Sequence, residues 1–399
     1  AGAWFFQPLF LLAYMLKCVI SLGPLKDAGA EALSISQFPN EHKTVDRVAS
    51  LVPDVRLQRI SMERAHMYGP GQFAAAIAML RAVPRIWRFL QLLARRHSFM
   101  PAARIASALA FYMCFSRLLA SRPALKSVIV ASNYSPEAVG VAAAAHRSGR
   151  QVIYANHAPV PANALVVPPV LADCALFYGV KTGEIYERRS RCAADVALIG
   201  QPYAARAMEW REEVTTVGIF LTAGTRADVL QSLVASVRLD LPEARIIIRQ
   251  HPVLLLKTDF SGIGVDDPRT ELTIGNPLED EIAACDLVIC GNSGVAMNVV
   301  SSGRPVAYLS SLDGLSFDAC GFVANRLVLS VPWWTEDIYD RLKGFYQTPG
   351  WEGVMQSYDA SYGRDLAELH AEASQVLMRH LRPEAPGDET ALHRVRAIA

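Results

Sequence analysis

The chain has 399 residues, more than a single hydrophobic core usually serves, so two domains are expected. Hydrophobic residues make up 52% and charged residues 19%, which is apolar for a soluble protein, and the formal net charge is +1. The seven cysteines are scattered without a C-x-x-C pair. This spacing argues against a metal cluster and fits reduced thiols in a cytosolic protein.

The first half of the chain alternates strand and helix patterns after an apolar start. The stretch before Lys17 is mostly apolar but shorter than the ~20 residues of a spanning helix, which predicts a buried or interfacial helix. The segment 38–43 (FPNEHK) is expected to be a loop. We expect strands over 31–38, 54–60, 127–133, 151–159, 174–179 and 195–202, and helices over 44–52, 71–96, 101–121, 136–149 and 182–189.

The segment from Arg64 to Pro136 carries ten arginines and lysines and no acidic residue. It includes a basic amphipathic pattern with Trp87 and Phe89, a combination that favours an anionic membrane surface. The alternative is a basic helical surface that binds nothing. Nucleic acid is not expected as a partner, because the segment is rich in Ala, Leu and Phe and lacks a nucleic-acid-binding motif.

The charged segment 203–214 is expected to connect two domains, since the alternation of strands and helices starts again after it. This alternation predicts parallel sheets with ligands at the carboxyl ends of the strands. We therefore predict an α/β fold of two Rossmann-like, doubly wound domains with C-terminal helices. The N-terminal domain covers 1–205, with a basic helical insertion at about 64–126, and the C-terminal domain covers 206–399. In the latter, strands are expected over 216–225, 244–252, 271–276, 286–291 and 305–311, and helices over 227–241, 279–285, 294–303 and 364–381.

Two short motifs in the second half indicate a phosphate site. The strand RIIIRQ ends at His251 and Pro252, and proline stops the ladder there. A second strand ends in the turn Gly-Asn-Ser-Gly, where Asn292 and Ser293 are good N-cap residues for the helix that follows. A helix N-terminus at a strand end favours an anion. The alternative interpretation is a pair of structural turns without a ligand.

The two halves, the His-Pro pair and the pattern DLVICGNSG…SGRPV over roughly 127–310 resemble GT-B glycosyltransferases. The subgroup that they resemble is the bacterial capsule and lipopolysaccharide transferases, which use a CMP-activated sugar such as sialic acid or Kdo. The CDP-glycerol glycerophosphotransferases share a similar layout. The resemblance implies that the two domains face a cleft, with the acceptor on the N-terminal side and the nucleotide sugar on the C-terminal side.

The resemblance also implies roles for single residues. His251 and Ser293, with Asn292, would bind the donor phosphate, and Gly224 and Thr225 would lie on a loop that faces the cleft. Arg249, two residues before His251, would add positive charge. The catalytic base is expected among Glu41, His42 and His157. The consecutive carboxylates that serve some sialyltransferases as a base are not found, and neither is an acidic metal motif. Transfer without a metal and without a cofactor is therefore expected.

The expected function is a glycosyltransferase of bacterial surface-glycan synthesis, which moves a sugar from a nucleotide donor to a lipid-linked or polysaccharide acceptor. It would be cytoplasmic and peripheral on the inner face of the inner membrane. Three alternatives stay open: a transferase for a CDP-activated polyol phosphate, a UDP-sugar 2-epimerase of the same fold, and a binding module without catalysis. The long basic insertion argues against a soluble epimerase.

Overall fold

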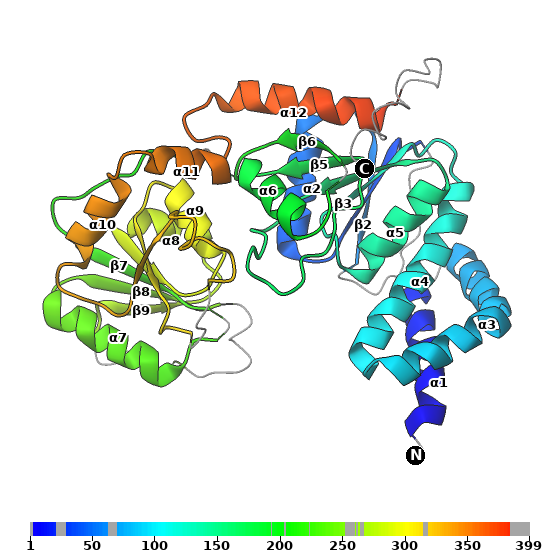
Figure 1. Ribbon diagram of the computed structural model, residues 1–399, viewed down its shortest axis with the longest axis horizontal. Coiled ribbons are helices and arrows are strands. Elements are labelled where there is room, and N and C mark those ends of the chain that lie inside the picture. Colours follow the sequence, from blue (N-terminus) through cyan, green and yellow to red (C-terminus); the bar gives the residue numbers. More distant parts are fainter. Residues whose placement is uncertain are drawn as a thin grey trace.

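The computed structural model describes residues 3–20, 29–62, 70–192, 194–202, 205–222, 224–251, 260, 262–263, 267–313 and 318–383. They form two lobes, each built around a six-stranded parallel sheet (Figure 1). This confirms the prediction of two doubly wound α/β domains.

The first sheet has the strand order β2-β1-β3-β4-β5-β6. Its central strands are buried apolar runs, as expected of parallel strands covered on both faces. The strands are β1 (Ala32–Ser36), β2 (Leu57–Ser61), β3 (Ser127–Val130), β4 (Gln151–Ala155), β5 (Cys174–Phe177) and β6 (Asp195–Leu198), and the connecting helices are α2 (Pro39–Leu51), α5 (Pro136–Arg147) and α6 (Val180–Arg189). The order reverses between β1 and β3, so the loops after these two strands flank a ligand-binding position.

The second sheet has the order β12-β11-β10-β7-β8-β9, which reverses between β7 and β10. Gly303, after the helix that follows β10, has φ +76°, which suits a glycine at a helix end. The strands are β7 (Thr216–Phe220), β8 (Arg245–Arg249), β9 (Thr270–Thr273), β10 (Leu287–Cys290), β11 (Val306–Leu309) and β12 (Leu329–Val331), and the helices are α7 (Ala227–Asp240), α8 (Leu278–Ala284), α9 (Val295–Ser301), α10 (Ile338–Tyr346) and α11 (Trp351–Tyr358). The elements β12, α10 and α11 have no counterpart among the sequence expectations.

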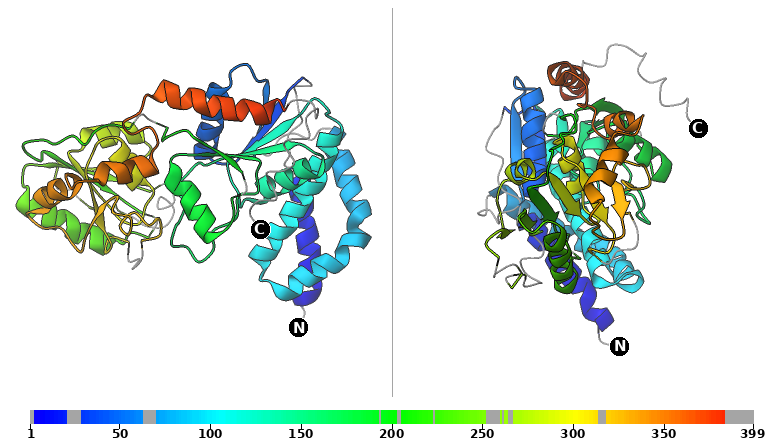
Figure 2. Two further views of the ribbon diagram at one scale, coloured as in Figure 1. Left: turned by 45° about the horizontal axis from the view of Figure 1, so that its top comes forward. Right: turned by 90° about the vertical axis from the view of Figure 1, so that its left-hand side faces the viewer.

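Three further helices pack together at the outer end of the first lobe (Figures 1 and 2). They are α1 (Ala3–Ile20), α3 (Pro70–Arg96) and α4 (Phe99–Ala120), and we call them the three-helix unit. Among the described helices, α4 alone is long and apolar enough to cross a membrane. It packs against α1 and α5, and buries Ala103, Ala110 and Phe115 in the core of the lobe. We therefore describe α4 as a core helix.

The last helix, α12 (Leu366–Leu381), packs on the first lobe although the sequence analysis grouped it with the second domain (Figure 1). Its buried stripe is Leu369, Ala373, Leu377 and Leu381, and the last three of these join a cluster with residues of α2, β4 and β5. The amphipathic pattern shows that this helix needs an apolar partner, but it does not indicate which of the two sheets provides it.

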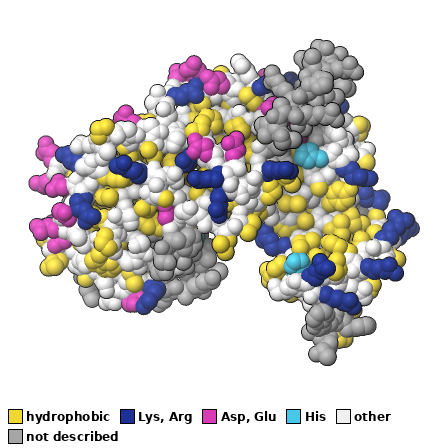
Figure 3. All heavy atoms as spheres, in the orientation of Figure 1, with side chains coloured by type: hydrophobic (Ala, Val, Ile, Leu, Met, Phe, Trp, Pro, Cys, Tyr) yellow, Lys and Arg dark blue, Asp and Glu magenta, His cyan; other side chains and the backbone are white. Residues whose placement is uncertain are grey.

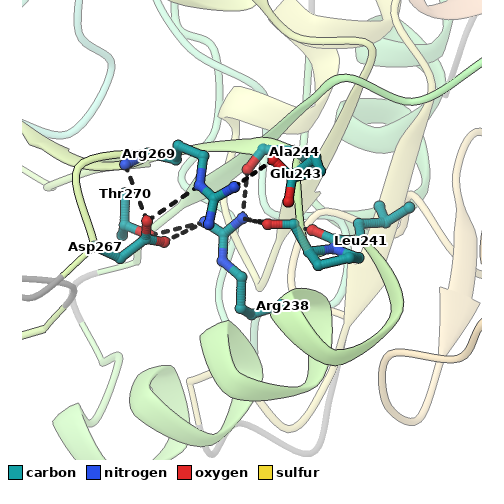
Figure 4. Close-up of polar contacts among 8 residues, drawn as sticks. Arg238, Leu241, Glu243, Ala244, Asp267, Arg269 and Thr270 are labelled. Carbon is teal, nitrogen blue, oxygen red and sulfur yellow. Dashed lines mark hydrogen bonds and ion pairs between the residues drawn. The ribbon is translucent and has the colours of Figure 1, made fainter.

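Arginine–carboxylate contacts hold the edge of the second sheet (Figure 4). Arg238 at the end of α7 lies 2.6 Å from a carboxylate oxygen of Asp267 and 3.1 Å from Oγ1 of Thr270. Arg269 contacts the same carboxylate and that of Glu243. Asp267 therefore has a structural role here.

One buried carboxylate joins both crossings of the chain between the lobes. Asp359 is 0% exposed and accepts hydrogen bonds from the backbone N–H of Gln201 (3.0 Å) and of Ser361 (3.0 Å). It also accepts from the hydroxyls of Ser361 (2.6 Å) and Ser301 (2.9 Å). Gly200 has φ +68°, and a Cβ there would lie 2.7 Å from Cβ of Ser361, so this crossing requires glycine.

We expect Asp359→Ala to lower the free energy of unfolding by about 3 kcal/mol or more, because each buried donor left without an acceptor costs about 1–3 kcal/mol. Urea unfolding of the variant, beside the exposed-site control Asp340→Ala, measures this. An unfolding midpoint equal to that of the control would show that the carboxylate does not hold the crossings together.

Candidate functional site

The carboxyl edges of the two sheets face each other, and their loops are in contact. A Cβ at Gly294, after β10, would lie 3.2 Å from Cδ of Pro159, after β4. The backbone N–H of Asn163, also after β4, donates to the carbonyl of Ala319 in the loop after β11 at 3.0 Å, which is a second contact between the lobes. The structure therefore places the His157 loop and the Ser293 turn in one inter-lobe site, although the two are far apart in the sequence.

The turns after β7 and β10 are held against Asp313, which follows β11. The Asp313 carboxylate accepts from the backbone N–H of Asn292 at 2.6 Å, and a Cβ at Gly291 would lie 2.6 Å from its oxygen. A Cβ at Gly224 would lie 3.0 Å from the Asp313 carbonyl. Thr225 is buried and its Oγ1 accepts from the backbone N–H of Thr222 at 3.0 Å, so it supports its own turn.

The Ser293 side chain lies at the start of α9 in a way that differs from the expected N-cap. The helix begins at Val295, with Gly294 in the capping position. Ser293 Oγ accepts from the backbone N–H of Val295 at 3.3 Å, which leaves its own hydroxyl proton to donate. The Asn292 side chain accepts from the backbone N–H of Ala319 at 3.1 Å. The polar turn is therefore fixed by contacts to the loop after β11 as well as by the helix.

His251 follows β8, one strand away from the reversal point of the second sheet. Its ring is half-buried, and burial lowers its pKa below the ordinary value, which favours the neutral imidazole. Pro252, the second half of the expected motif, lies outside the described residues. Arg249 does not join His251: its guanidinium bonds the carboxylate of Glu281 and the carbonyl of Asn276 (2.9 Å). In this structure Arg249 is therefore engaged in an ion pair, and its contribution to a phosphate site stays a prediction.

His157 is held in one orientation at the end of β4. Its Nδ1 bonds the carbonyl of Ala131, at the end of β3. A carbonyl can only accept, so Nδ1 carries the proton and the neutral ring keeps its lone pair on Nε2. The neighbouring Asn156 is buried and accepts from the backbone N–H of Ala158 at 2.9 Å, which shapes the turn.

Glu41 and His42 lie in the first turn of α2, which corrects the expected loop at 38–43. Glu41 is 3% exposed, and its carboxylate accepts from the backbone N–H of Gln37 (2.6 Å) and Phe38 (3.4 Å). It thus caps the helix, whose first turn begins at Pro39. His42 Nδ1 lies 2.6 Å from the Ser36 hydroxyl. Both side chains make these contacts near the reversal point of the first sheet.

Sequence reasoning missed Asp313, Arg104 and Glu137. Asp313 has no motif, and its role appears only once β11 and β10 are neighbours. Arg104 donates to the carbonyl of Tyr134 at 3.0 Å, which joins α4 to the loop after β3. Glu137, in the first turn of α5, is 6% exposed, and burial raises the pKa of its carboxyl. Its dipeptide Pro136-Glu137 is a signal for a helix start, but not for a buried acid.

The described residues include no group of three or more His, Cys, Asp or Glu arranged to hold a metal ion. The chemistry that the described site offers comes from imidazole, hydroxyl and backbone groups. Of these groups, Nε2 of the neutral His157 ring can accept a proton and the Ser293 hydroxyl can donate one.

Comparison of the whole chain with solved structures identifies its fold. The chain is similar to the UDP-GlcNAc 2-epimerase from Neisseria meningitidis bound to UDP-GlcNAc, with a TM-score of 0.54 and 11% identity over 88% of this chain and 99% of that one. It is also similar to the glycotransferase of kitacinnamycin (TM-score 0.52, 11% identity, 88% and 98% covered). The calicheamicin glycosyltransferase CalG4 gives a TM-score of 0.50 at 11% identity, with 88% and 99% covered.

The chain has the GT-B fold. This confirms the fold that the sequence resemblance implies. No protein-family model matches the sequence, and no curated protein matches it.

Proposed function

We propose that this protein is a glycosyltransferase that moves a sugar from a nucleotide donor to an acceptor bound between its two lobes. One observation supports this most: the loops at the carboxyl edges of both sheets meet at Pro159 and Gly294. Ligands of doubly wound sheets bind where the strand order reverses, and the turns after β7 and β10 flank that position in the second sheet. A donor there would lie beside a base from the first lobe.

In this proposal, His157 is the catalytic base. Nε2 would accept the proton of the acceptor hydroxyl. The oxygen of that hydroxyl would then form a bond to the anomeric carbon of the donor sugar, while the bond between this carbon and the donor phosphate breaks. The Ala131 carbonyl would stabilise the ring once it becomes cationic, because it bonds the proton on Nδ1.

The leaving phosphate would be stabilised by Ser293 and His251. The Ser293 hydroxyl can donate, and a bound phosphate would favour the protonated form of His251. No metal is required by this arrangement, because hydrogen-bond donors fixed in place can stabilise the developing charge.

We propose a CMP-linked sugar as the donor, on the sequence resemblance described above. We expect cytidine nucleotides to raise the melting temperature more than uridine, adenosine or guanosine nucleotides at equal concentration. A ligand at about 100 times its Kd stabilises the folded state by about 2.7 kcal/mol. Differential scanning fluorimetry with the monophosphates and diphosphates measures this. A larger shift with UDP would indicate a uridine nucleotide as the donor instead of a cytidine nucleotide. If none of the nucleotides raises the melting temperature, the proposed function is wrong.

A UDP-sugar 2-epimerase is the second candidate, because the Neisseria meningitidis enzyme with this fold is a UDP-GlcNAc 2-epimerase. A CDP-activated polyol phosphate donor is the third, on the sequence resemblance. The reactions differ in what they need. An epimerase converts its nucleotide sugar without an acceptor, whereas both transferases release a nucleotide when an acceptor is added. Incubation with UDP-GlcNAc alone, followed by nuclear magnetic resonance of the sugar, identifies the epimerase.

We further propose that the protein works in the cytoplasm on the inner face of the inner membrane, in surface-glycan synthesis. The three-helix unit supports this. Its surface exposes Phe10 (62%), Leu80 (50%) and Met100 (66%) beside arginines of α3 and α4. Figure 3 shows Lys, Arg and hydrophobic side chains over this end of the first lobe, with acidic side chains mainly over the other lobe. Apolar groups beside basic ones suit an anionic bilayer.

We expect the protein to float with vesicles of phosphatidylglycerol and phosphatidylcholine at low salt and to detach at high salt. Replacing four exposed α3 arginines by glutamine, namely Arg85, Arg88, Arg95 and Arg96, should release it, since each basic residue near such a surface contributes about 1 kcal/mol. The control removes the same charge from the other lobe at the exposed residues Arg226, Arg245, Arg341 and Lys343. Equal flotation of both variants would refute this membrane face.

A further inference from the structure

An open apolar cavity of about 510 Å³ lies in the first lobe, away from the contacts described for the donor. Its floor is formed by Val130 and Tyr154 of the sheet, and its walls by α5 and the segment 168–172. The volume lies within the ~300–1,000 Å³ of pockets that take small molecules. Figure 3 shows a broad hydrophobic patch on this face of the lobe.

The walls of this cavity expose large apolar side chains to solvent. Tyr134 is 53% exposed, Val139 42% and Leu171 62%. A monomeric protein seldom exposes a contiguous set of such side chains unless they bind something. The polar groups at one end are already occupied: Asn133 donates to the Pro168 carbonyl at 2.9 Å, and Ser132 Oγ accepts from the backbone N–H of Ser135 at 3.1 Å.

One end of the cavity adjoins the proposed base, and a cation lies beside it. The lining residues Val130 and Ser132 stand on either side of Ala131, whose carbonyl holds His157. Arg104 of α4 donates to the Tyr134 carbonyl at 3.0 Å, which brings its guanidinium to the mouth. The far end is at His146, whose Nε2 lies 3.2 Å from the Asp173 carboxylate. The cavity thus has an apolar lining, and the cationic side chain of Arg104 lies at its opening, near the proposed base His157.

We propose that this cavity binds the acyl or prenyl chain of a lipid-linked acceptor, with the anionic group that follows the chain near Arg104. This inference rests on the proposed function, because it assigns the acceptor of the same site. The apolar walls fit a hydrocarbon chain, and the charge of Arg104 complements a phosphate. An acceptor hydroxyl beyond that phosphate would reach Nε2 of His157.

The test measures binding of decyl phosphate by calorimetry and, with a diazirine analogue, by cross-linking and mass spectrometry. Ala142→Trp should weaken binding at least about tenfold, because losing about two buried methylenes already has that effect. Arg147→Trp places the same ring on the same helix outside the cavity and should leave binding unchanged. Leu171→Glu, at an exposed wall position, gives a second variant should the tryptophan disturb the fold.

Three outcomes separate the ideas. Cross-links within 130–146 and 168–172, together with the loss in Ala142→Trp, support the cavity. Equal binding by Ala142→Trp and Arg147→Trp, or cross-links elsewhere, overturn it. Arg104→Gln should weaken decyl phosphate binding more than decanol binding, and equal losses would refute the headgroup position. Nucleotide stabilisation is measured on the same variants, so that failure of the proposed function is seen separately from failure of the cavity.

Discussion

Replacing His157 by alanine is expected to lower turnover by about 10²–10⁴-fold, the range that a positioned base contributes. The Nδ1 contact to the Ala131 carbonyl leaves Nε2 of the neutral ring as the atom that can accept a proton. Donor binding should change little, because the proposed donor contacts come from the second lobe. The measurement is acceptor-dependent release of nucleotide, with donor affinity from the thermal shift.

The control for this change is His97→Ala, which removes an exposed imidazole from the turn between α3 and α4. It should retain wild-type turnover. A folded His157→Ala protein with activity within about threefold of wild type would remove His157 from the reaction, because even the low end of the base contribution is about 10²-fold.

His251→Ala is expected to lower turnover by about 10²–10³-fold, as loss of one donor to a developing negative charge does. Unlike the change at His157, it should also weaken nucleotide binding. The same His97→Ala variant serves as the control. Wild-type nucleotide affinity and turnover in folded His251→Ala protein would exclude the imidazole from the donor site.

A pH titration of nucleotide affinity distinguishes this role from a structural one. Burial lowers the pKa of His251 in the free protein, whereas a bound phosphate favours its charged form and raises that pKa. His251 therefore takes up a proton when the nucleotide binds. The nucleotide affinity rises as the pH falls from the pKa of His251 in the complex towards its pKa in the free protein. The wild type should show a steeper rise on the acidic side of neutral than His251→Ala, whose remaining pH dependence comes from the nucleotide phosphate. Parallel pH profiles would contradict the contact.

The sequence contains enough to predict the two sheets, because buried parallel strands are short apolar runs bounded by turn residues. The strands around Ile129, Ile153 and Ile289 are recognisable in this way. The sequence predicts a helix from residue 44, whereas α2 begins at Pro39. The earlier start is hard to recognise because Phe38 is not an ordinary N-cap residue and the cap is made by Glu41, inside the first turn. The elements β12, α10 and α11 are too short for the period of their hydrophobic residues to distinguish a helix from a strand.

For the candidate site, the sequence predicts where some residues lie but not what they contact. A histidine or serine at a strand end points to the carboxyl edge of a sheet, which is how His157 and Ser293 were found. Their neighbours depend on tertiary contacts that no local pattern shows. The pairing of Arg249 with Glu281 and the position of Asp313 between two turns both follow from the strand order.

Hydrogen–deuterium exchange with and without CMP tests most directly whether a nucleotide binds between the lobes. The account predicts slower exchange in the turn 291–297, in the segment 247–251 at the end of β8 and in the loop 156–160, with little change in α3 and α4. Protection that avoids 291–297 and 247–251, or appears only in the first lobe, would contradict a donor site at the reversal point of the second sheet.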